Sequence, residues 1–317
     1  MKGKLSLTAV ALLLVLVISS VSVIPAFATS ATAPDISGAS TVYLENLETG
    51  KVILRKESSD SIAPASSAKL ITAMLALEHF KDAEDTTVKI TKEMLSQSEG
   101  TSMKLAEGDE LSAIDLIYAT LCGGFNDAAY ALAIACEGSA KNFVERMNAK
   151  ASDLGARKTT YKNPTGFDSV GATTTLSDLI KISRAAANDE RITSISSALS
   201  RKVKFTNSGE EFTVHNRNGL IGSHYFQGYT NPYASGLISG NTDLGGCCVI
   251  TKFTIRGANY LCIVMGASEE NGVVNSYKIA NDLSEYLRLN FGFKTVMNKG
   301  DKICELDIAY ARGKSSS

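Results

Sequence analysis

Two predicted β-hairpins, one near each end of the chain, constrain its fold more than any other feature. In the first, residues 41–47 and 51–55 flank the turn Glu48-Thr49-Gly50. In the second, the β-rich segments 246–255 and 259–266 meet at a short turn. Because helical patterns fill the sequence between them, we expect both hairpins to join in one antiparallel sheet packed with helices. The predicted fold class is therefore α+β.

The sequence between the hairpins carries apolar residues at helical spacing. It predicts helices at 66–80, 112–121, 126–137, 140–154 and 177–188, strands within 201–216 across the turn Asn207-Ser208-Gly209, and a last helix at about 276–289. The chain has 317 residues, of which 44% are hydrophobic and 21% charged, and these values are ordinary for a globular protein. We expect one main domain at 40–293, after a flexible leader at 29–39.

The N-terminus has the three parts of a secretory signal peptide. Lys2 and Lys4 precede an apolar run at 5–24, and the small residues Ala26 and Ala28 follow it. We predict that residues 1–28 are a signal peptide cleaved after Ala28, and that the mature protein is exported to the extracytoplasmic space or the cell wall. No later segment is apolar enough to cross a membrane.

Charge and cysteine usage exclude several classes of function. Thirty-two basic and thirty-three acidic residues leave no field that would recruit nucleic acid. The six cysteines show no CxxC pair and the three histidines are scattered, so we predict no metal site. Cys122, Cys136 and Cys262 lie in apolar surroundings and are expected to be buried; Cys247 and Cys248 should point to opposite faces of a strand. A disulfide in an exported chain remains open.

The tetrapeptide Ser66-Ser67-Ala68-Lys69 places a hydroxyl and an amine one helical turn apart. Side chains at positions i and i+3 share a helix face, so Lys69 can reach the Ser66 hydroxyl. A lysine whose pKa is lowered by burial can then accept the serine proton, which is the Ser-Lys form of nucleophilic catalysis. A Ser-x-x-Lys tetrapeptide also arises by chance in chains of this length, so it does not identify a site alone.

Several longer blocks of the sequence follow one another in the order STVYLENLETGKVILRKESS, APASSAKLITAMLALE, EGTSMKLAEGDELSAIDLIYATL, MNAKASDLGARKTTYKNPTGFD and CCVITKF. In content and order they resemble the low-molecular-mass penicillin-binding proteins, the serine D-alanyl-D-alanine carboxypeptidases, over about residues 38–295. This resemblance implies the transpeptidase fold shared by penicillin-binding proteins and β-lactamases. It also implies that Ser66 is the acylated nucleophile and Lys69 its general base.

The second and third motifs of this family are altered. In the segment that matches Ser-x-Asn, Asn126 is kept and Gly124 stands where the family has a serine that helps relay a proton. In the segment that matches Lys-Thr-Gly, Ser239 preserves the hydroxyl of the threonine, Gly240 is kept, and Ile238 replaces the lysine. Thr242 follows as a substrate-binding residue.

The family's carboxylate-binding arginine has no counterpart, because residues 268–275 contain neither lysine nor arginine. Loss of both cations should weaken binding of a terminal carboxylate, and we expect weak binding of β-lactams for the same reason. Two motifs keep two interpretations each. Arg217 either belongs only to the turn 216–219 or replaces the missing cation, and Asn163-Pro164-Thr165-Gly166 is either only a tight turn or a border of the cleft.

The resemblance leads to two hypotheses for function. The first is a serine D-Ala-D-Ala carboxypeptidase that acts on peptidoglycan stem peptides through an acyl-enzyme, with impaired activity. The second is a degenerate homologue that binds wall peptides as a scaffold; a β-lactamase fits the blocks less well. Nothing calls for a cofactor. Residues 294–317 resemble the stub of a C-terminal β domain, and no membrane anchor is expected after signal cleavage.

Overall fold

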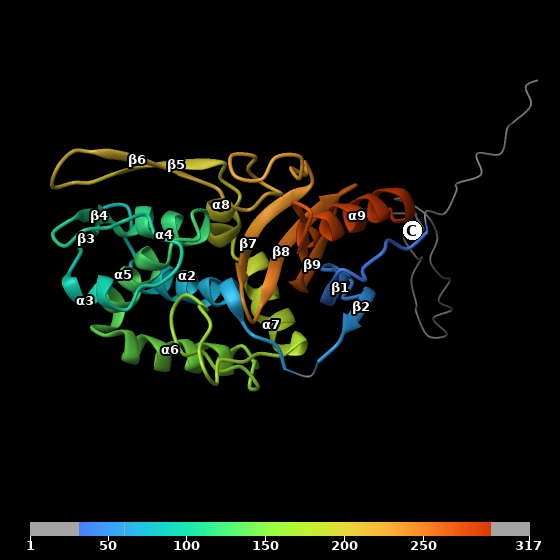
Figure 1. Ribbon diagram of the computed structural model, residues 1–317, viewed down its shortest axis with the longest axis horizontal. Helices are drawn as coiled ribbons and strands as arrows, with labels where there is room; N and C mark the ends of the chain where they lie inside the picture. The colour runs from blue at the N-terminus through green and yellow to red at the C-terminus, as the bar shows by residue number, and fades with distance from the viewer. Residues whose placement is uncertain (1–31, 60, 293–317) are drawn as a thin grey trace, which may run out of the picture. The chain divides into compact units, whose positions relative to one another are not determined.

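A computed structural model describes residues 32–59 and 61–292 (Figure 1). The predicted signal peptide, the first residues of the leader and the predicted stub at 294–317 lie outside the described residues, as does Cys304.

The central element is a five-stranded antiparallel sheet built from both ends of the described chain. Its strand order is β2-β1-β9-β8-β7. The strands are β1 (Ala39–Asn46), β2 (Val52–Glu57), β7 (Ala234–Thr242), β8 (Gly246–Ile255) and β9 (Ala258–Ala267). β1 pairs with β9 from Ala39↔Ala267 to Asn46↔Tyr260, so the two hairpins share one sheet. The α+β prediction is confirmed, and β7 is left as an edge strand.

Apart from α3 and α8, the helices lie close to the predicted ranges. They are η1 (Ala65–Ser67), α2 (Ala68–His79), α3 (Lys92–Ser96), α4 (Ala113–Leu121), α5 (Asn126–Glu137), α6 (Ala140–Asp153), α7 (Leu176–Asn188), α8 (Glu190–Ser196) and α9 (Asn275–Asn290). Side chains that accept hydrogen bonds from backbone amides set several starts, for example Ser112 for α4 and Thr175 for α7. Within the described residues, none of the helices has both the length and the apolar character needed to span a bilayer.

Three short antiparallel ladders complete the described fold. They are β3 (Thr87–Lys89) with β4 (Glu110–Ser112), β5 (Ser200–Lys204) with β6 (Glu211–His215), and β10 (Glu269–Glu270) with β11 (Val273–Val274). The β5–β6 hairpin confirms the strands predicted within 201–216. Helices α3 and α8 and the other two ladders were not predicted.

The sheet is covered on both faces, and each face has its own apolar cluster. Helix α9 packs on β8 and β9 over one face, whereas α2, α7 and their neighbours cover the other (Figure 1). Cys247 belongs to the α9 cluster and Cys248 to the α2 cluster, as strand alternation predicted. The described cysteines are free thiols.

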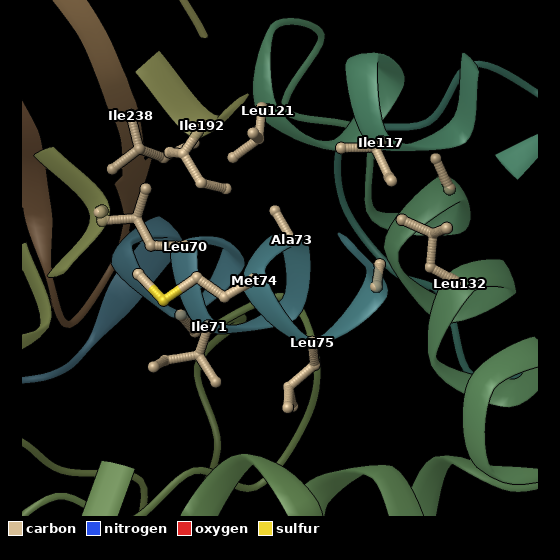
Figure 2. Packing of buried hydrophobic residues seen from close by; sticks show 14 of the residues in the cluster. Leu70, Ile71, Ala73, Met74, Leu75, Ile117, Leu121, Leu132, Ile192 and Ile238 are labelled. Carbon is tan, nitrogen blue, oxygen red and sulfur yellow. The ribbon is translucent and has the colours of Figure 1, made fainter. Parts of the chain in front are cut away.

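Helix α2 is buried along almost its whole length, because its sequence is apolar on every side. Leu70, Ile71 and Met74 project from it into the surrounding helices (Figure 2). The packing fixes the position of the turn that precedes α2. That turn carries the predicted nucleophile.

Candidate active site

A cavity of about 310 Å³ opens beside the edge strand β7. Its walls include the residues predicted for catalysis and substrate binding, which are Ser66, Lys69, Asn126, Ser239, Gly240 and Thr242. Gly124 from the second motif also lines it. The predicted residues come from the continuous segment of η1 and α2, from α5 and from β7, three regions that are far apart in the sequence. The fold therefore brings the three altered or intact motifs to one place.

Ser66 lies in the 3-10 turn η1, and Lys69 lies in the first turn of α2. The Lys69 ammonium donates to Ser66 Oγ at 3.4 Å and to the carbonyl oxygen of Thr165 at 3.0 Å. Only 2% of Lys69 is exposed, and this burial lowers its pKa to about 8. At pH 7 about a tenth of the Lys69 side chains therefore carry the neutral amine, the form that can accept a proton from a serine.

The turn Asn163-Pro164-Thr165-Gly166 holds the lysine's second partner. Asn163 Oδ1 accepts hydrogen bonds from the backbone amides of Thr165 and Gly166, at 3.1 and 2.7 Å. This Asx-type turn directs the Thr165 carbonyl at Lys69, and Thr165 also lines the cavity. The segment is therefore a tight turn that also borders the cleft, and the interpretation that it is only a turn is wrong.

Asn126 lines the cavity and has a buried side-chain acceptor. Its side-chain amide nitrogen donates to the carbonyl oxygen of Glu99, which orients the group. Within the described part of the chain, the buried Oδ1 atom has no hydrogen-bond partner. A buried acceptor without a partner costs free energy, so the geometry favours a ligand that supplies an N–H group here.

Gly124 has a left-handed backbone, with φ of +64°, where any other L-residue is strained. A Cβ at this position would meet only Arg217 Cδ, at 3.9 Å. Arg217 lines the cavity near Gly124, and its guanidinium lies 4.4 Å from the centre of the Tyr225 ring. The residue named as a replacement cation therefore does face the candidate site.

Strand β7 approaches the nucleophile at Gly240. A Cβ on Gly240 would overlap Ser66 Oγ, so only glycine fits there without movement of the serine. The Ser239 hydroxyl lies 3.0 Å from the Tyr277 hydroxyl, which is also 3.1 Å from the carbonyl oxygen of Arg217. Tyr277 thus joins the edge strand to the segment that carries Arg217.

Ile238 lies outside the cavity. It is 1% exposed and belongs to the apolar cluster with Leu70 and Ile192 (Figure 2). The aliphatic part of a lysine at this position would lie among apolar side chains. Unless the surroundings rearranged, its ammonium would lie there too. The third motif therefore contributes a hydroxyl and a close backbone approach to this site, and no charge.

Several residues of the cavity were missed in the sequence. Tyr277 and Ser276 come from the first turn of α9, Cys247 from β8, and Glu269 from β10. Glu269 stands in the segment 268–275 that was searched for a cation, so a search for either sign of charge would have found it. Cys248 lies close to Lys69, but burial raises the pKa of its thiol to about 12 and keeps it neutral. Among the residues described, no group of His, Cys, Asp and Glu side chains could hold a metal ion.

Comparison with known proteins identifies the family of this chain. Residues 27–269 match the D-alanyl-D-alanine carboxypeptidase family. The chain belongs to this family. It is 29% identical over 231 residues to the D-alanyl-D-alanine carboxypeptidase DacF of Bacillus subtilis, which covers 72% of this chain and 57% of that protein. It is also 29% identical over 269 residues to a D-alanyl-D-alanine endopeptidase of Escherichia coli, covering 84% and 83% of the two chains.

A solved structure confirms the fold. The D-alanyl-D-alanine carboxypeptidase of Mycobacterium tuberculosis matches with a TM-score of 0.70 and 26% identity, over 81% of this chain and 93% of that chain. The resemblance inferred from the residue blocks and the fold class that it implied are both correct. The chain spans little more than half the length of the Bacillus relative.

The lowered pKa of Lys69 predicts a specific pH dependence of stability in this family member. The pKa is about 8 in the folded chain and about 10.4 for an unfolded lysine. Between these values the unfolded state binds one more proton, so the free energy of unfolding should rise with pH, by about 3 kcal/mol in total. Urea denaturation of the wild type and of Lys69→Met from pH 7 to 11 checks this, because the variant should lack that rise. Parallel curves for the two proteins would contradict the assigned pKa.

Proposed function

We propose that this chain is a serine D-Ala-D-Ala carboxypeptidase that acts on peptidoglycan stem peptides through an acyl-enzyme. The observation that carries the proposal is the Lys69–Ser66 pair, with Nζ and Oγ 3.4 Å apart at the base of the cavity. A buried amine with a lowered pKa beside an accessible hydroxyl is the arrangement that serine acyl transfer requires. Membership of the family supports the same reaction. The predicted export would place the enzyme with its wall substrate.

In the proposed reaction, the neutral Lys69 amine takes the proton of the Ser66 hydroxyl while Oγ attacks the carbonyl carbon of the penultimate D-alanine. Backbone amides near Ser66 and on β7 stabilise the oxyanion. The tetrahedral intermediate collapses as the peptide C–N bond breaks, and the Lys69 ammonium returns the proton to the nitrogen of the departing D-alanine. Water then hydrolyses the ester and restores Ser66.

The substrate backbone has a natural place along β7, which is a free edge of the sheet. Asn126 Oδ1 would accept an N–H of the acyl-donor peptide, since that atom is buried without a partner in the described structure. Ser239 and Arg217 would bind the terminal carboxylate, through a hydroxyl and a guanidinium on the same cavity. Thr242 lies two residues beyond Gly240 on β7 and would contact the bound peptide there.

The replaced motif positions support a slower enzyme than its intact relatives. Gly124 removes a hydroxyl that could relay the proton, so Lys69 must exchange it directly with the leaving nitrogen. Ile238 removes a cation, and one guanidinium on a flexible side chain remains to hold the carboxylate. If these losses abolish turnover, the same cavity becomes a wall-peptide scaffold, which is the second hypothesis.

Acylation of Ser66 tests the two hypotheses against each other. The mature protein is incubated with a fluorescent penicillin and, separately, with a stem pentapeptide, and intact mass and D-alanine release are measured. We expect a covalent adduct and D-alanine release in the wild type, and neither in Ser66→Ala. No adduct and no D-alanine at high ligand concentration would overturn the enzyme and favour the scaffold.

The position of Arg217 predicts its effect on substrates with a free carboxylate. Arg217→Ala should lower kcat/KM for a peptide that ends in D-Ala-D-Ala by about tenfold, because a charge-assisted hydrogen bond is lost. The same substitution should change the rate little when the terminal carboxylate is converted to an amide. Arg256→Ala is the matched control, because Arg256 is exposed in the β8–β9 turn and does not line the cavity. Equal losses on the acid and the amide substrate would exclude a carboxylate-binding role.

A further inference from the structure

Glu269 brings a carboxylate into the same cavity. It is an exposed residue of β10, directly after the last strand of the main sheet, and it pairs with Val274 in the short β10–β11 ladder. It is the only carboxylate among the described residues that line the cavity. Throughout residues 32–59 and 61–292, no side chain forms an ion pair or a hydrogen bond with its carboxylate.

The other two charges of the cavity do not neutralise Glu269. The Lys69 ammonium is held by Ser66 Oγ and the Thr165 carbonyl, and it is buried at the base. The Arg217 guanidinium lies over the Tyr225 ring. In the described structure the cavity therefore carries a guanidinium and a carboxylate that are not paired with each other. A ligand that satisfies both must offer a cation as well as an anion.

We propose that Glu269 binds a protonated primary amine of the substrate, so that the cavity prefers a peptide with a free side-chain ammonium over the same peptide with that amine acylated. This inference rests on the proposed function and extends it to a substrate class. Two positions on a wall peptide can supply the amine: a diamino acid in the acyl-donor stem, or a diamino acid as the leaving residue. The chemistry at Glu269 is the same for both.

Glu269 also lies opposite the N-cap residue of α9. Val274 is that N-cap, and the first turn of α9 contains no acidic residue. A carboxylate near the positive end of a helix stabilises it, so loss of the charge can lower the stability of the fold with no role in binding. The test must therefore measure selectivity as a ratio between two substrates, which a change in stability does not move.

Two pairs of synthetic peptides provide that ratio. In the first pair, Nα-acetyl-L-Lys-D-Ala-D-Ala has a free ε-amine or carries an Nε-acetyl group. In the second, the leaving residue is D-Lys with a free or an acetylated ε-amine, and the acyl donor carries no amine. Ratios of kcat/KM within each pair show which position supplies the ammonium.

We expect the wild type to prefer the free amine about three- to fivefold in one pair, because a partly exposed ion pair contributes modestly. Glu269→Gln should bring the ratio close to one, and Glu269→Lys should invert it. The preference should also fall as salt is added. Glu270→Gln is the matched control, since its carboxylate is the next along β10, is exposed and does not line the cavity. It should leave the ratio unchanged.

Failure of this inference differs from failure of the proposed function. Equal rates within both pairs, or a preference that survives in Glu269→Gln, would overturn the ammonium site, even if all the peptides are cleaved. A lower melting temperature of Glu269→Gln with an unchanged ratio would assign the residue to α9 alone.

If no peptide is cleaved, calorimetric titration of Ser66→Ala and of Ser66→Ala/Glu269→Gln with the same peptides tests the ammonium site. Tighter binding of the free amine, lost in the double variant, supports the site without turnover, and equal affinities overturn it.

Discussion

Burial of the Lys69 ammonium is the interaction on which the rest of the site depends. Desolvation disfavours the charged form, and among the described residues its direct partners are only a carbonyl and a hydroxyl. Burial of this lysine lowers the free energy of unfolding at pH values below its pKa. It also yields an amine that can act as a base. Helix α2 makes this possible, because its apolar faces fix the first turn deep between the sheet and the helical layer.

Much of the fold follows from local signals that do not depend on distant residues. Turn residues at 48–50 and 207–209 and the alternation around them predict the hairpins, and the apolar periodicity of α4, α5 and α7 predicts the helices. Helix α8 was missed because it is one short element whose apolar residues, Ile192 and Ile195, are stabilised by packing in the main core. The β3–β4 and β10–β11 ladders were missed for a similar reason, since two or three residues give no measurable alternation.

In the candidate site too, residues in local motifs could be predicted from the sequence, whereas contacts between distant segments could not. Ser66, Lys69, Asn126, Ser239 and Gly240 were found because each lies in a motif with a known spacing, and the structure brings them to one cavity. The direction of the Asn126 amide depends on the Glu99 carbonyl, from a different loop, and could not be read from the motif. Ile238 was assigned to the site by its place in the third motif, whereas its surroundings place it in the core. Tyr277 needed the position of α9 against β8, which no local pattern reports. Glu269 lies in the segment 268–275, where a search for acidic residues as well as basic ones would have found it.

The central claim is that a buried lysine with a lowered pKa activates Ser66. The most direct measurement is the rate constant for acylation of Ser66 by a stem peptide, followed by quenched-flow intact mass between pH 5 and 10. The account predicts a rate that rises about tenfold per pH unit and levels off near pH 8, where the Lys69 amine becomes neutral. A rate that is flat over this range, or that still rises at pH 10 as for an ordinary lysine, would contradict it.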